Sequence, residues 1–70
     1  MEENLSPEVK KVLLEQEITR WKQEQYTLEI RFRVNTKIGT PPEGLVSLKA
    51  ALEQCEKAID ALKEELKAIK

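Results

Sequence analysis

The most reactive side chain is that of Cys55, the only cysteine in this chain of 70 residues. A thiol becomes a nucleophile when a base or a cation stabilises its thiolate, and the usual base is histidine. The chain contains no histidine. Cys55 also falls within a regular apolar repeat, where a structural thiol is inert. We therefore expect no catalytic residue, and a single cysteine forms no disulfide within its own chain.

Carboxylates are the other candidates for chemistry, because Asp and Glu together account for 13 residues. Acid–base catalysis and carboxylate-bound metals need such groups to converge on one point. In this sequence they occupy outward helical positions beside Lys or Arg, as on a solvated surface. The segment 39–44 has glycine at both ends but lacks the full G-x-x-x-x-G-K-[ST] pattern and the preceding strand that bind phosphate. The sequence therefore predicts no enzymatic activity, no metal and no cofactor.

Charge also limits the choice of partners. The 12 Lys and Arg nearly balance the 13 Asp and Glu, for a net charge of -1, so the attraction to nucleic acid or to an anionic membrane is weak. Arg31, Arg33 and Lys37 form a small basic cluster, which makes a nucleic-acid-associated accessory role the alternative function. No apolar run approaches the roughly 20 residues that span a bilayer, and the acidic start is unlike a signal peptide. We expect a cytoplasmic protein.

An apolar repeat between residues 45 and 69 organises the chain. Its members lie alternately three and four residues apart, the heptad spacing of a helix that packs along one seam. They are Leu45, Leu48, Leu52, Cys55, Ile59, Leu62, Leu66 and Ile69. Thr40, Pro41 and Glu43 predict a capping box at the start of this helix, with the Thr40 side chain as N-cap. We expect the helix to span about 41–69.

A shorter seam precedes this repeat and predicts the partner helix. Its residues have helical spacing. They are Leu14, Ile18, Trp21, Leu28 and Phe32. Ser6 and Pro7 are typical of an N-cap and a first helical position, and both Asn35 and Gly39 tolerate the left-handed backbone that ends helices. We expect a helix over about 6–33 and a loop over about 34–40.

Residues 26–34 admit a second interpretation. Apolar and polar side chains alternate along this segment, as in a half-buried strand. No other part of the chain is strand-like, so such a strand would have to pair with another molecule. As a helix, the segment completes a first arm that matches the second, at roughly 42–44 Å each. Matched arms suit an antiparallel hairpin, so we expect a helix and keep the intermolecular strand as the alternative.

The first helix is apolar on two sides. Apolar residues near both of its ends lie roughly opposite its seam, where a hairpin partner does not reach. They are Leu5, Val9, Val12, Tyr26, Ile30 and Val34. Leaving them exposed forgoes on the order of 9–12 kcal/mol of burial at about 25 cal/mol per Å². An exposed patch of this kind usually marks a protein–protein interface. We assign the interface to Val9, Val12, Tyr26, Ile30 and Val34.

The sequence thus predicts a single all-α domain over residues 1–70, an antiparallel two-helix hairpin with a coiled-coil-like seam. A core this small yields only about 3–5 kcal/mol, so an oligomer is the remaining route to stability. The simplest closed solution is a symmetric dimer that forms a four-helix bundle. We expect a non-enzymatic protein–protein interaction module, such as a small assembly subunit, adaptor or chaperone-like cofactor. Its partner is a copy of itself or another helical protein.

Overall fold

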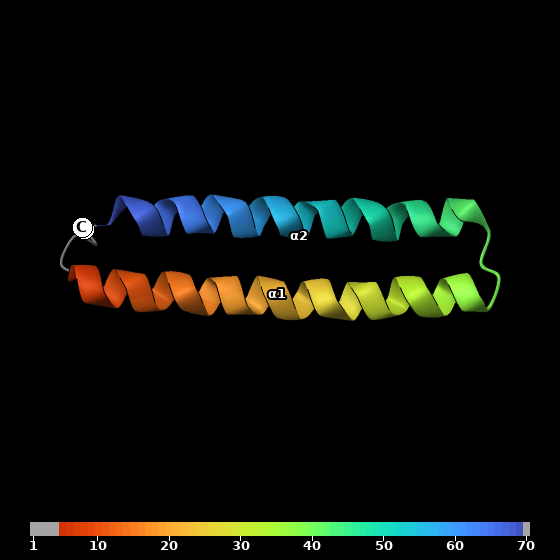
Figure 1. Ribbon diagram of the computed structural model, residues 1–70, viewed down its shortest axis with the longest axis horizontal. Coiled ribbons are helices and arrows are strands. Elements are labelled where there is room, and N and C mark those ends of the chain that lie inside the picture. Colours follow the sequence, from red (N-terminus) through yellow and green to blue (C-terminus); the bar gives the residue numbers. More distant parts are fainter. Residues whose placement is uncertain (1–4, 70) are drawn as a thin grey trace.

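The computed structural model describes residues 5–69. Helix α1 spans Pro7–Lys37 and helix α2 spans Pro42–Ala68. The two helices lie side by side and antiparallel, joined by one short turn, so that residues 5 and 69 lie at the same end of the molecule (Figure 1). No strand is present between residues 5 and 69. The chain is therefore an all-α helical hairpin, as the two seams predict.

The molecule is a rod whose principal extents are 51 × 20 × 14 Å. Its radius of gyration is 16.1 Å, whereas a compact domain of 70 residues has one of about 11 Å. A pair of helices has no second layer to pack against. The apolar side chains therefore divide between one helix–helix contact and the outer surface.

Helix α1 begins as predicted from Ser6 and Pro7. Ser6 is the N-cap in an extended conformation, and its Oγ accepts a hydrogen bond from the Val9 N–H at 3.3 Å. Pro7 is the first helical residue, where its missing N–H costs nothing. Glu8 places a negative charge in the first turn, at the positive end of the helix dipole.

Residues 26–34 lie inside α1, so the strand alternative is wrong. In a helix, the alternating apolar residues divide between two faces. Leu28 and Phe32 are buried and half-buried, whereas Tyr26, Ile30 and Val34 are exposed. Helix formation satisfies the backbone within the chain, and a lone strand would leave its N–H and C=O groups without partners. The alternation of apolar and polar residues thus arises from a helix that is apolar on two sides.

Helix α1 ends four residues later than expected, at Lys37 instead of about residue 33. Asn35 does not end it, because Asn35 is helical and its side-chain Nδ2 donates to the Arg31 carbonyl at 2.7 Å. Gly39 ends it, with a φ of 83°. The N–H of Gly39 donates to the Thr36 carbonyl at 3.2 Å, and the N–H of Thr40 donates to the Asn35 carbonyl at 2.9 Å. These two bonds are those of a Schellman motif.

The predicted capping box at α2 is also wrong. Pro41 is the N-cap of α2 and makes no side-chain cap bond. The Thr40 Oγ1 donates to Asn35 Oδ1 at 2.9 Å, so this hydroxyl closes the end of α1 and does not serve α2. A Cβ at Gly44 would lie 2.7 Å from Thr40 Cγ2. Gly44 therefore allows the close approach of the first turn of α2 to Thr40.

Candidate protein–protein interface

The inward seam between α1 and α2 contains every residue that the two apolar repeats predict. Ile18, Leu28, Cys55 and Ile59 are between 1% and 9% exposed. The other nine are half-buried. They are Leu14, Trp21, Phe32, Leu45, Leu48, Leu52, Leu62, Leu66 and Ile69. Because the arms run antiparallel from a turn at Gly39 and Thr40, Leu28 lies level with Leu52 and Ile18 lies level with Leu62.

Cys55 is the most deeply buried residue, at 1% exposed. Burial raises the pKa of its thiol, and the negative charge of Glu24 raises it further. A nucleophilic cysteine needs the opposite, a lowered pKa beside a cation or a base. The environment of Cys55 therefore keeps the thiol protonated and suits a packing role in the seam.

Polar and small residues complete the seam. Gln25 and Asn35 continue the helical register of α1 and are half-buried. On α2, Ala51 and Ala58 are half-buried beside the apolar repeat. No buried side-chain N or O atom among residues 5–69 lacks a hydrogen-bond partner. The buried polar side-chain atoms of the seam thus need no hydrogen-bond partner from another chain.

The opposite side of α1 contains the five residues that we assign to the interface. Val9, Val12, Tyr26, Ile30 and Val34 are between 40% and 60% exposed in the single chain. The structure therefore places all five outside the hairpin seam, on the side of α1 that faces away from α2. Leu5, just before α1, is also exposed.

The two apolar ends of this side belong to one continuous stripe, which sequence reasoning missed. Between Val12 and Tyr26, three polar but uncharged residues continue the spacing of three and four. The outer stripe consists of Val9, Val12, Gln16, Thr19, Gln23, Tyr26, Ile30 and Val34. All eight are exposed and none is charged. The available signal was the absence of charge at these positions, in a chain of which 36% is charged.

The threonine hydroxyls in and beside the middle of the outer stripe cost little to cover. The Thr19 Oγ1 donates to the Glu15 carbonyl at 3.0 Å, and the adjacent Thr27 bonds in the same way to the Gln23 carbonyl at 3.0 Å. These hydroxyl groups already have partners inside the helix. Covering them with another protein therefore leaves no donor of theirs without a hydrogen bond.

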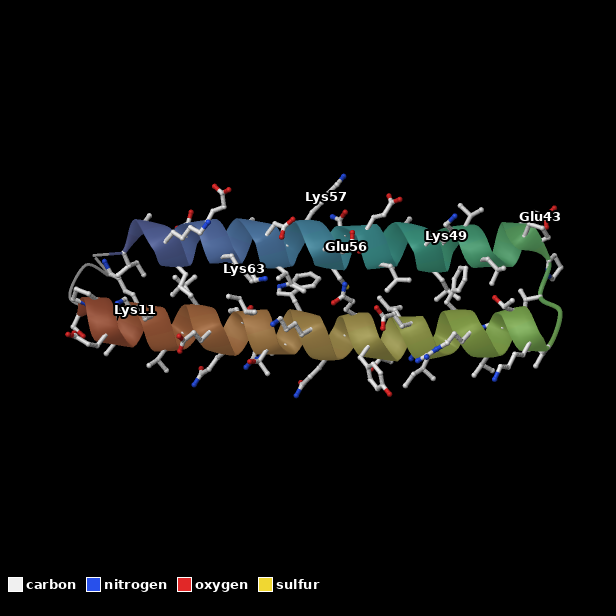
Figure 2. All side chains as sticks on the ribbon, viewed as in Figure 1. Lys11, Glu43, Lys49, Glu56, Lys57 and Lys63 are labelled. Atoms are coloured by element: carbon white, nitrogen blue, oxygen red, sulfur yellow. The ribbon has the colours of Figure 1, made fainter. Side chains whose placement is uncertain are left out.

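The outward side of α2 is different, because it is charged. Figure 2 shows Lys57 pointing away from α1 on this side. Val46 is the only large exposed hydrophobic residue of α2 among those that the structure describes. The two helices thus present unlike surfaces to their surroundings.

The basic cluster does not form one patch. At about 100° per residue, Arg31 and Arg33 are roughly 160° apart around α1. Only Arg33 and Lys37, four residues apart, share a side of the helix. A nucleic-acid surface would need its cations on one side.

Other kinds of site have little support in the described part of the chain. The hollows along the helix pair are shallow and open to solvent. One of them is lined by Glu29, Phe32, Arg33 and Leu52. Among residues 5–69, no three Cys, Asp or Glu residues are grouped so that they could hold a metal ion. No helix in that range is both long and apolar enough to cross a membrane.

Comparison with protein-family models, curated proteins and solved structures gives no significant match to this chain.

Proposed function

We propose that the protein is a non-enzymatic protein–protein interaction module that binds an amphipathic helix through the outer stripe of α1. The observation that carries this proposal is the contrast between two exposed surfaces of one hairpin. The outward side of α2 is charged, whereas α1 has an uncharged stripe with apolar residues at both ends. A helix facing only water is expected to be polar there.

The spacing of the outer stripe indicates the form of the partner. Residues that recur at intervals of three and four along a helix form a seam that fits a second helix. The stripe extends from residue 9 to residue 34, about 39 Å at 1.5 Å per residue. A helix of about seven turns would cover it. The role is then that of a small assembly subunit, adaptor or chaperone-like cofactor.

A cytoplasmic location accords with this proposal, because a free thiol persists in a reducing compartment. The nucleic-acid-associated alternative has less support, since Arg31 and Arg33 lie on different sides of α1. Binding through those cations would also weaken steeply with added salt. Binding through the outer stripe would not, because the stripe has no charge.

Photo-crosslinking in cells that produce the protein tests the proposal. A photoreactive residue replaces Ile30 in one variant and Val12 in a second. It replaces Lys57, on the charged side of α2, in the matched control. We expect the variant at Ile30 to crosslink to an amphipathic helix of a protein, which peptide mass spectrometry would locate. The control should give no such product. Absence of a protein crosslink from both Ile30 and Val12, or a crosslink to nucleic acid, would contradict the proposal.

A further inference from the structure

The order of residues along the outer stripe is nearly symmetric about its midpoint. A pair of aliphatic residues stands at each end of a polar centre, with Tyr26 between the centre and the second pair. Val9 and Val12 form one end, and Ile30 and Val34 form the other. Reversing the direction of α1 therefore leaves the pattern of apolar and polar positions almost unchanged.

We infer that the partner of the outer stripe is the outer stripe of a second copy of this chain, running in the opposite direction. This inference rests on the proposed function and identifies the helix that covers the outer stripe. Full overlap of the two stripes places Val12 of one copy opposite Ile30 of the other, and Val9 within one residue of Val34. Gln16 then faces Tyr26, and Thr19 faces Gln23. Aliphatic residues meet aliphatic residues near the ends, polar Gln16 meets the aromatic Tyr26, and polar Thr19 meets polar Gln23 at the centre.

The heptad register supports the antiparallel arrangement. In an antiparallel coiled coil each layer combines an a position of one helix with a d position of the other. With Val9, Gln16, Gln23 and Ile30 as a positions, Val12, Thr19 and Tyr26 are d positions. The three layers named above, Val12 with Ile30, Gln16 with Tyr26, and Thr19 with Gln23, all combine an a with a d. One register therefore accounts for the stripe from Val9 to Ile30, and Val34, four residues after Ile30, lies beside it at an e position.

The exposed area of the single chain is large enough for such a contact. The chain exposes 5583 Å², about 1,100 Å² more than the roughly 4,500 Å² of a compact protein of 8.1 kDa. A stable interface of standard size buries about 800 Å² on each partner. One contact between copies would thus remove most of the excess that the rod shape creates.

The position of the outer stripe fixes the arrangement of the dimer. The stripe lies roughly opposite the seam to α2. Two copies would therefore form a row of four helices, with the two α1 helices in the centre and an α2 helix on each outer side. The expected four-helix bundle is then an open layer of helices, because a closed bundle needs the two apolar faces of α1 to be adjacent.

Charged residues beside the outer stripe predict how association between copies depends on salt. Arg20 and Lys22 flank the midpoint, so each would lie near its copy in the dimer. Arg20 is already paired with Glu17, with 3.4 Å between Nη1 and Oε2. Added salt screens the remaining like-charge repulsion. Association should therefore become modestly tighter with salt, unlike association driven by opposite charges.

A charge-pair experiment on the full chain tests both the occupant and its direction. The variants are Val12→Glu, Ile30→Lys and the double variant, with Lys57→Glu as the control on α2. Sedimentation equilibrium should show a dimer for the wild type and for the control. Each single variant should weaken association at least tenfold while circular dichroism shows unchanged helix content. The double variant should recover most of the loss, because the new carboxylate of one copy faces the new ammonium of the other.

Two results would overturn the inference. A wild-type chain that stays monomeric up to millimolar concentration would exclude the second copy as the partner. A double variant that associates no better than either single variant would exclude the antiparallel direction, because parallel copies place like charges together. If the chain is monomeric but Ile30 crosslinks to a helix of another protein, the proposed function stands and this inference fails.

Discussion

The two helices of this hairpin differ in the number of sides on which they are apolar. In α2 the apolar repeat faces α1, and the outward side is charged. In α1 the inward seam has an uncharged counterpart on the opposite side. The difference separates two roles that a count of hydrophobic residues would merge. The seam residues hold the hairpin together, and the outer stripe is the surface proposed to bind a partner.

The largest expected effect comes from placing a charge in the seam. Leu62 is half-buried in α2, and Leu62→Glu puts a carboxylate between the helices. We expect a loss of more than about 3 kcal/mol in the free energy of unfolding, enough to unfold a hairpin of this size. Far-UV circular dichroism would show the loss of helix.

The same change on the outer stripe is the matched control. Ile30→Glu should leave the helix content intact when the chain is dilute, because Ile30 is 40% exposed there. If both variants unfold to the same extent, or if neither does, the distinction between seam and stripe is wrong.

Truncation of side chains sharpens the comparison within α2. Ile59 is buried, and Ile59→Ala should lower the free energy of unfolding by about 2–4 kcal/mol through lost burial and a residual cavity. Val46→Ala, at an exposed position of the same helix, should change it by no more than about 0.5 kcal/mol. Urea denaturation with an unchanged m-value measures both. Equal losses would show that the inward and outward sides of α2 do not differ in packing.

The buried thiol gives a smaller effect, which depends on pH. Burial and Glu24 raise the pKa of Cys55 in the folded chain, whereas a free thiol has a pKa of about 8.5. The folded state therefore holds its proton to higher pH than the unfolded state. The contribution of the Cys55 thiol to stability is complete below the pKa of the unfolded state. It is lost as the pH rises through the pKa of the folded state. Denaturation series from neutral to alkaline pH should show this decline in the wild type.

The control for the thiol is Cys55→Ala, which removes the titrating group. It should be less stable at neutral pH and should lack the cysteine-dependent part of the alkaline decline. A parallel decline in the two proteins would show that other groups cause it. A thiol reagent should also react more slowly with the folded wild type than with the unfolded chain.

The smallest expected effect concerns the cap of α1. Ser6→Ala removes the acceptor of the Val9 N–H and should cost about 1 kcal/mol in the free energy of unfolding. Ser47→Ala is the matched control, because Ser47 is an exposed residue inside α2 and alanine is the better helix former there. Thermal denaturation should show a lower midpoint only for the first. An unchanged midpoint for Ser6→Ala would mean that water replaces the cap.

Hydrophobic spacing was sufficient to predict the two helices and the seam. Every residue from Leu45 to Ile69 with the predicted heptad spacing is buried or half-buried. The turn was harder, because Asn35 and Thr40 can each cap a helix on either side of them. Which helix the Thr40 hydroxyl serves depends on the path of the chain through Gly39. Sequence spacing carries no information about that path.

The outer stripe was predicted only at its ends, for a similar reason. Val12 and Ile30 stand out as apolar residues, whereas Gln16, Thr19 and Gln23 look like ordinary surface residues one at a time. Their common side of α1 becomes informative only once the helix is known to be continuous from Pro7 to Lys37. The identity of the partner depends on a second surface, and one stripe does not specify it.

The arrangement of the turn has a mechanical consequence. Because residues 5 and 69 lie at the same end of the rod, tension applied between them would load the layers of the seam one after another, starting farthest from Gly39 (Figure 1). The two helices would therefore separate one layer at a time, at low force. Tension applied along the rod, from the bend to the opposite end, would instead be carried by the backbone and hydrogen bonds of the helix that is pulled, without separating the layers of the seam.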